Sequence, residues 1–185
     1  MRHRMLGFTL VSFLGAAAPP LANASDRDFR ARLVPLDEVP SVSSGARGSF
    51  RAELNSAGTE LSYTLTYRNL EGTVTQAHIH FGDKDVNGGI SLWLCSNLPG
   101  PPAGPTPPGT QACPIAPEVT ITGTLGAAET VGPAGQGIAA GEFDEIVRAI
   151  RRGFAYANVH SDPFFGGEIR GQIKRVDRDN DDRDD

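Results

Sequence analysis

Short runs of alternating apolar and polar residues, rich in β-branched and aromatic side chains, recur along most of this chain between turn residues. Alternation with a period of two is typical of strands that bury one face. The eight runs are residues 29–36, 48–54, 60–67, 74–81, 90–95, 118–125, 154–160 and 167–174. They predict an all-β fold, an antiparallel Greek-key β-sandwich of about eight strands. Turn residues at 55–58 and 165–167 predict tight connections between neighbouring strands.

One segment, residues 141–153, has a helical rather than a strand-like period. Its apolar residues are spaced at i, i+3, i+4 and i+7, which places them on one side of a short helix: Phe143, Ile146, Val147 and Ile150. Acidic residues in the first turn and arginines in the last suit the helix dipole, and Gly153 is a suitable stop. We expect this helix to lie across one end of the sandwich.

The two ends of the chain do not share the strand pattern. Residues 1–24 combine a basic start, an apolar stretch too short to span a bilayer and small residues before a cleavage point after Ala24, which is typical of a signal peptide. A retained N-terminal anchor is the competing interpretation. Residues 176–185 are acidic, almost without apolar side chains, and are expected to be a disordered tail. The folded domain is therefore predicted at residues 25–175.

Charge and hydropathy limit the partners and the compartment. The net charge of −5 becomes −7 once Arg2 and Arg4 leave with the signal peptide, which argues against nucleic acid or an anionic membrane as partner. No segment after the signal peptide is long and apolar enough to span a membrane. We expect a periplasmic or secreted protein, and the sequence does not set its oligomeric state.

Two cysteines, Cys95 and Cys113, flank much of a proline-rich segment at residues 97–117. An even cysteine count in an exported chain favours a disulfide, with thiolate ligation of a metal as the rival interpretation. Proline removes backbone donors and fixes φ, so residues 97–117 are predicted to form a long loop inserted in the domain.

The histidines are few and are placed in strands. After loss of His3, the chain keeps His78, His80 and His160. His78 and His80 are two residues apart and therefore share one face of a strand, away from the core. His160 lies on the non-core face of its own strand, so adjacency of the two strands would bring three imidazoles together. Such a site suits copper, zinc or nickel better than hard cations.

A calcium-loop motif begins just after the histidine pair. Asp83, Asp85 and Asn87 stand at positions 1, 3 and 5 of such a loop and Gly88 at position 6. Position 12 is Leu94, so the bidentate glutamate is missing. The flanking residues also read as strands rather than helices, so calcium is disfavoured and a hairpin loop with solvated acids is the better interpretation.

Four short motifs, taken in order, resemble the CHRD domain family, which is widespread among exported bacterial proteins. They are "EVP" (Glu38 to Pro40), "AHIH" (Ala77 to His80), "NVH" (Asn158 to His160) and "GGEIRGQ" (Gly166 to Gln172). The resemblance extends over about residues 29–174, with 97–117 as an insertion. It implies an extracytoplasmic β-sandwich and leaves the function open.

A looser similarity concerns chemistry: "HIHFGD" resembles the H-x-H-x-x-G-D stretch of copper-zinc superoxide dismutases. Carried over, it implies that His78 and His80 bind copper, with His160 as a third ligand. One residue fewer separates the second histidine from the glycine here. The chain without its signal peptide has no fourth histidine, and it has no histidine-rich zinc loop. Only a copper-only arrangement is consistent with the similarity.

Three functions remain open from the sequence. The first is a copper superoxide dismutase, whose anionic substrate Arg170 would attract towards the metal unless Arg170 pairs with Glu168. The second is a non-catalytic module that buffers copper or binds another exported protein. The third is a zinc hydrolase with Glu168 or Asp162 as the base. The role of Glu38 is left open.

Overall fold

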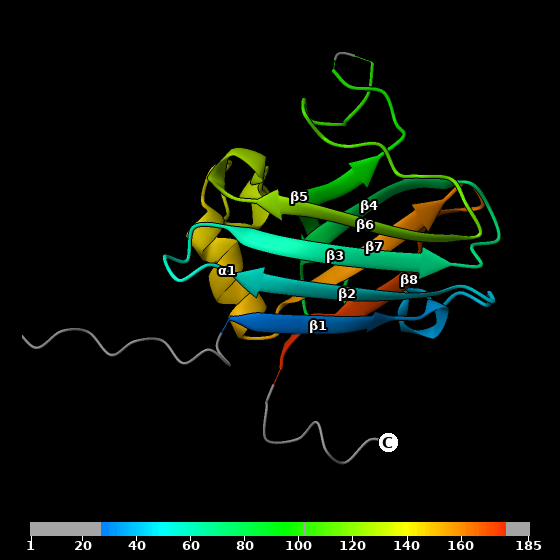
Figure 1. Ribbon diagram of the computed structural model, residues 1–185, viewed down its shortest axis with the longest axis horizontal. Coiled ribbons are helices and arrows are strands. Elements are labelled where there is room, and N and C mark those ends of the chain that lie inside the picture. The colour runs from blue at the N-terminus through cyan, green and yellow to red at the C-terminus, as the bar shows by residue number, and fades with distance from the viewer. Residues whose placement is uncertain (1–26, 102, 177–185) are drawn as a thin grey trace, which may run out of the picture.

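The alternating runs form nine antiparallel strands in two sheets, as the computed structural model shows for residues 27–101 and 103–176 (Figure 1). The predicted signal peptide at 1–24 and the tail from residue 177 lie outside the described residues. The strands, in chain order, are β1 (Asp28–Leu33), β2 (Arg47–Leu54), β3 (Leu61–Arg68), β4 (Val74–Phe81), β5 (Gly89–Ser96), β6 (Glu118–Leu125), β7 (Ala155–Ser161), β8 (Phe164–Gln172) and β9 (Lys174–Arg175).

The two sheets pack face to face, which confirms the predicted all-β sandwich. One sheet has the order β6-β3-β2-β1-β9 and the other β5-β4-β7-β8. Strand β3 pairs with β6, and β4 pairs with β7, so strands distant in sequence become neighbours through connections that cross between the sheets. The core between the sheets is built from the inward-facing apolar residues, among them Leu33, Phe50, Leu65, Ile79 and Val159, which have no exposed surface.

The helix α1 (Phe143–Arg151) lies across one end of the sandwich, as predicted (Figure 1). Its four predicted apolar residues are buried, and Gly153 follows the helix with φ of 77°. Three short 3-10 helices complete the described structure: η2 (Pro35–Asp37), η3 (Ala127–Glu129) and η4 (Ala134–Gln136). Among the described residues, no helix has the length and apolar character needed to cross a bilayer.

The turn predicted at residues 165–167 is wrong, because these residues belong to β8 and the turn lies at Asp162–Pro163. The glycine at 167 has a different purpose. A Cβ there would lie 2.7 Å from Glu38 Oε1 and 2.6 Å from the Asn158 amide, so Gly167 allows these two polar side chains to pack against the strand. The turn at 55–58 is confirmed, with the Gly58 N–H donating to the Asn55 carbonyl (3.0 Å).

The sheets also meet along the edge formed by β1 and β8. The Val34 N–H donates to the Arg170 carbonyl (3.0 Å) and the Arg170 N–H to the Val34 carbonyl (3.3 Å). A Cβ on Gly171 would stand 2.1 Å from the Arg32 carbonyl oxygen, so only glycine permits this approach. The segment after β1 is thereby drawn over the outer face of the four-stranded sheet.

Candidate metal centre

The outer face of the β5-β4-β7-β8 sheet is polar and nevertheless buried. Its buried members from three strands are His78, His80, Tyr156, Asn158, His160, Glu168 and Arg170. Two loops cover this face, the segment after β1 and residues 82–88 between β4 and β5. They contact each other, since the Asn87 side-chain amide donates to the Val39 carbonyl (2.9 Å). The face therefore forms a second, polar core.

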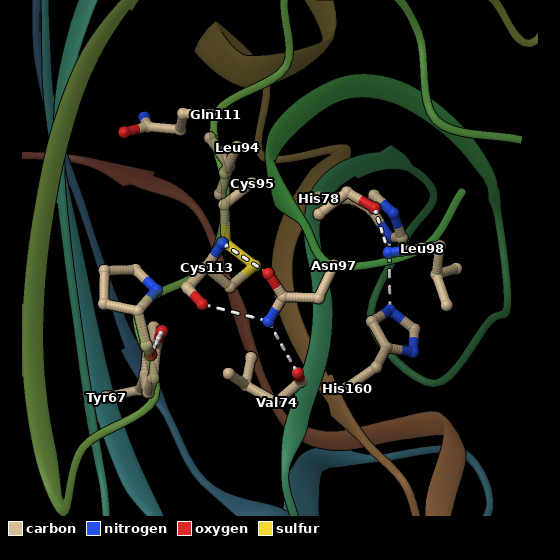
Figure 2. Close-up of a disulfide and its surroundings, with 12 residues drawn as sticks. Tyr67, Val74, His78, Leu94, Cys95, Asn97, Leu98, Gln111, Cys113 and His160 are labelled. Carbon is tan, nitrogen blue, oxygen red and sulfur yellow. Dashed lines mark hydrogen bonds between the residues drawn. A yellow bond between two sulfur atoms is a disulfide. The ribbon is translucent and has the colours of Figure 1, made fainter. Parts of the chain in front are cut away.

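The three histidines converge on this face. Strands β4 and β7 are neighbours, as the sequence interpretation required, with His78 opposite Asn158 and Gln76 opposite His160. One ring nitrogen from each histidine lies within 4.8 Å of the other two, and His78 Nδ1 is 3.2 Å from His160 Nε2. Figure 2 shows these two imidazoles facing each other. The three side chains are between 1% and 8% exposed, so the cluster can hold a metal ion away from solvent.

Backbone carbonyls fix the orientation of two of the rings. His80 Nδ1 donates to the Gly88 carbonyl (3.0 Å) and His160 Nδ1 donates to the Phe165 carbonyl (2.9 Å). A carbonyl only accepts, so Nδ1 carries the proton in each neutral ring and Nε2 carries the lone pair. Metal-binding histidines are usually oriented by this kind of bond from the second nitrogen.

Unpaired nitrogens remain inside the cluster. His78 Nε2 and His80 Nε2 are buried with no hydrogen-bond partner among the described residues. A buried polar atom without a partner is costly, about 1–3 kcal/mol in a folded protein. Coordination to a metal ion is the interaction that satisfies an imidazole lone pair in such a place.

Burial keeps the three imidazoles neutral. It lowers the pKa of His80 to about 4 and that of His160 to about 4, and it lowers the pKa of His78 well below the usual value. The neighbouring imidazoles act in the same direction on His78, since a second positive charge in the cluster is unfavourable. Protons therefore do not compete for the lone pairs at neutral pH.

Two aromatic rings enclose the cluster. The Trp93 ring meets His78 edge to face, with 4.2 Å between centroids and an interplanar angle of 81°. The Tyr156 ring stacks in parallel on His80 at 4.8 Å, and its hydroxyl accepts the Gly88 N–H (3.1 Å). Sequence reasoning gave no role to Tyr156 or Trp93, and it identified Gly88 only as part of the calcium-like motif.

Arg170 lies behind Tyr156 as seen from His80. Its guanidinium carbon is 3.6 Å from the centroid of the Tyr156 ring, and β7 lies between β4 and β8. The guanidinium donates to the carbonyls of Asp83 (3.0 Å) and Val86 (2.8 Å) and to Asn87 Oδ1 (3.3 Å). Arg170 is 2% exposed. Because its hydrogen bonds all go to the loop, it holds the loop over the histidines.

The calcium-like motif is part of this loop. Asn87 Oδ1, a predicted ligand of that motif, accepts from Arg170, and two loop carbonyls do the same. The inward-facing oxygens of the loop therefore accept hydrogen bonds from the Arg170 guanidinium, while the side chains of Asp83 and Asp85 are exposed. Gly88 lies at the end of the loop, and only glycine fits there, because a Cβ would lie 1.7 Å from the Phe81 carbonyl oxygen.

Two buried carboxyl groups lie near the centre. Glu168 accepts from Ser161 Oγ (2.5 Å) and from the Glu71 N–H (2.8 Å), so it ties β8 to the loop before β4. Burial raises the pKa of Glu38 to about 8, opposed by the charge of Arg170 and by a hydrogen bond with Asn158. Glu38 is therefore mainly protonated at neutral pH.

The cysteines form the predicted disulfide, Cys95–Cys113, at the base of the proline-rich loop (Figure 2). Asn97 ties this base to the sheet, since its side-chain amide donates to the carbonyls of Cys113 (2.9 Å) and Val74 (3.0 Å). The sulfurs are consumed by the bridge, so the rival interpretation as thiolate ligands does not hold. A disulfide is compatible with an oxidising compartment.

A family model described as the CHRD domain matches residues 29–173, which is most of the chain. The protein belongs to the CHRD domain family. No curated protein and no solved structure matches it. The family identifies the domain, and the chemistry of the histidine cluster has to be argued from its geometry.

Proposed function

We propose that this CHRD domain protein is exported and binds one copper ion through His78, His80 and His160. One observation carries the proposal: the buried Nε2 atoms of His78 and His80 have no hydrogen-bond partner. Carbonyls hold the Nδ1 atoms of His80 and His160 and so orient those two rings toward the cluster. Such a cluster is costly in a metal-free protein and is stabilised by a metal ion.

Copper is favoured over zinc by the donor set and by charge. Among the described residues, the metal-binding group holds three neutral imidazoles and no carboxylate or thiolate. Imidazole sites bind Cu(II) more strongly than Zn(II) in the general affinity order of divalent metals. Cu(I) carries a single charge, which costs less to bury than the double charge of zinc.

Superoxide dismutation is the second candidate. Three protein ligands leave a coordination position for a small anion, and bound copper supplies one-electron redox chemistry. Arg170 adds a positive charge behind Tyr156, although its hydrogen bonds hold it against the loop. Because the histidines are at most 8% exposed, the substrate must enter while the covering loops are displaced. A binding function needs such opening only when the metal is loaded or released.

Metal titration of the metal-free mature chain tests the binding function. Wild type should bind one equivalent of copper and prefer copper to zinc in competition with a chelator. His160→Ala should weaken copper binding by roughly 100-fold or more, since one of three ligands is lost. Gln76→Ala is the matched control, because Gln76 lies on the same face of β4 and is not a ligand. Equal affinity in His160→Ala and Gln76→Ala would overturn the site.

Stopped-flow decay of superoxide tests turnover. Copper-loaded wild type should be faster than His160→Ala carrying the same amount of copper. Arg170→Lys, which keeps the charge, should preserve the rate better than Arg170→Gln, which should lower it roughly tenfold, the low end of electrostatic steering. If wild type is no faster than His160→Ala, dismutation is excluded and the binding function stands alone.

A further inference from the structure

A large cavity opens at the β1–β8 edge, away from the three histidines. It has a volume of about 590 Å³ and is bounded by β1 and β9, by Asp37 of η2, by the loop at 82–88 and by β8. Volumes of this size accommodate small-molecule ligands. None of the three histidines lines it, so it is a separate site.

The charge of the cavity is opposite to that of the chain. Five cationic side chains line it: Arg30, Arg32, Lys84, Arg170 and Lys174. Two acidic residues, Asp37 and Asp83, also line it, so the cations outnumber the acids. The whole chain has a net charge of −5. A concave surface with an excess of one sign concentrates the field that attracts a ligand of the other sign.

Strand pairing fixes these cations close together. Arg30 stands directly opposite Lys174 on β9 and directly opposite Arg51 on β2. Arg170 contributes to the same cavity, and the acceptors of its hydrogen bonds are neutral oxygens rather than carboxylates.

We propose that this cavity binds an anionic oxyanion group, the phosphate or sulfate of a small molecule. Guanidinium groups recognise the oxygens of such groups by paired, charge-assisted hydrogen bonds, and Arg30 and Arg32 line the cavity. Arg170 is buried and bonded to the loop, so it contributes its charge. Lys84 lies in the exposed part of the loop and lines the cavity together with the arginines of β1. The proposal uses none of the histidines, and the cavity shares only Arg170 and the loop at 82–88 with the metal centre.

Isothermal titration of the metal-free mature chain with inorganic pyrophosphate, and separately with inorganic sulfate, tests the site at low ionic strength. We expect saturable binding of one anion per chain, weakened roughly tenfold by Lys84→Ala and by Arg32→Gln. Arg68→Ala is the matched control, because it removes the same charge from exposed β3 outside the cavity and should change affinity less than twofold.

Three results would overturn the site: no saturable binding of either anion, equal weakening by Arg68→Ala, or undiminished binding in both cavity variants. Thermal unfolding of each variant shows that a lost affinity is not lost folding; both substituted side chains are exposed. Binding of sulfate and pyrophosphate alike identifies the shared oxyanion chemistry. Binding of pyrophosphate alone identifies a phosphate site.

Discussion

Replacing Gly88 by alanine tests how the loop at 82–88 controls the metal centre without changing a ligand. A Cβ at this position would lie 1.7 Å from the Phe81 carbonyl oxygen, whereas real Cβ atoms essentially never approach within 3.0 Å. The loop must therefore move by more than about 1 Å. The Gly88 carbonyl accepts from His80 Nδ1 at 3.0 Å, and a displacement of that size breaks the bond.

The expected effect is on metal affinity. Loss of the bond that orients a metal-binding histidine typically weakens binding by roughly 10- to 100-fold, or about 1.4–2.7 kcal/mol. We therefore expect the copper affinity of Gly88→Ala to be roughly 10- to 100-fold lower than that of wild type. The reason is that His80 then samples other orientations and its other tautomer. Gly45→Ala is the matched control, since a Cβ at Gly45 meets nothing within 4 Å.

Fluorescence of the single tryptophan, Trp93, reports copper binding directly, because its ring lies 4.2 Å from that of His78. Copper quenching curves in the presence of a competing chelator give the affinities of Gly88→Ala, Gly45→Ala and wild type. Circular dichroism verifies that the strands are intact. If folded Gly88→Ala binds copper within twofold of Gly45→Ala, the Gly88 carbonyl does not orient the ligand and the argument for the loop is refuted.

Three further predictions concern stability. Acidification from pH 6.5 to 4 should destabilise the metal-free protein by up to about 3 kcal/mol for each of His80 and His160. Their pKa values are about 4 in the folded protein and 6.5 in the unfolded chain, so the unfolded chain takes up the protons. Urea unfolding with no dependence on pH in this range would contradict this prediction. The stability of Glu38→Gln relative to wild type should rise by about 1.4 kcal/mol for each pH unit between 5 and 8. The raised pKa of Glu38 makes folding of wild type less favourable as pH rises, and glutamine does not titrate. Parallel plots of unfolding free energy against pH for the two proteins would refute this prediction. Joint replacement of Cys95 and Cys113 by serine should cost about 3 kcal/mol in denaturant unfolding, because the bridge closes a loop of 18 residues; an unchanged midpoint would show that the bridge does not restrain the unfolded chain.

The strands and the faces on which the histidines lie could be predicted because both depend on a local period. Alternation assigns each residue to a face, and His78 and His80 share a face whatever the register. His160 required one further condition, the pairing of β4 with β7, which the structure supplies. The turn near residue 165 was misplaced because glycines there were interpreted as turn signals, whereas Gly167 serves the packing of Glu38 and Asn158.

The burial of the site could not be predicted from the sequence. Alternation shows that His80 leaves the core face, but it does not show that a loop covers the outer face. The acceptors for His80 and His160 are backbone carbonyls of Gly88 and Phe165, and a carbonyl carries no residue-specific signal. The same holds for Arg170, whose partners are mostly loop carbonyls.

Counting the nitrogen ligands of bound copper tests the central claim most directly. Pulsed electron paramagnetic resonance of the mature chain loaded with one equivalent of Cu(II) should show coupling to three imidazole nitrogens. His78→Ala should remove one of them. Copper bound with the same nitrogen coupling in wild type and in His78→Ala, or bound without imidazole nitrogens, would contradict the account.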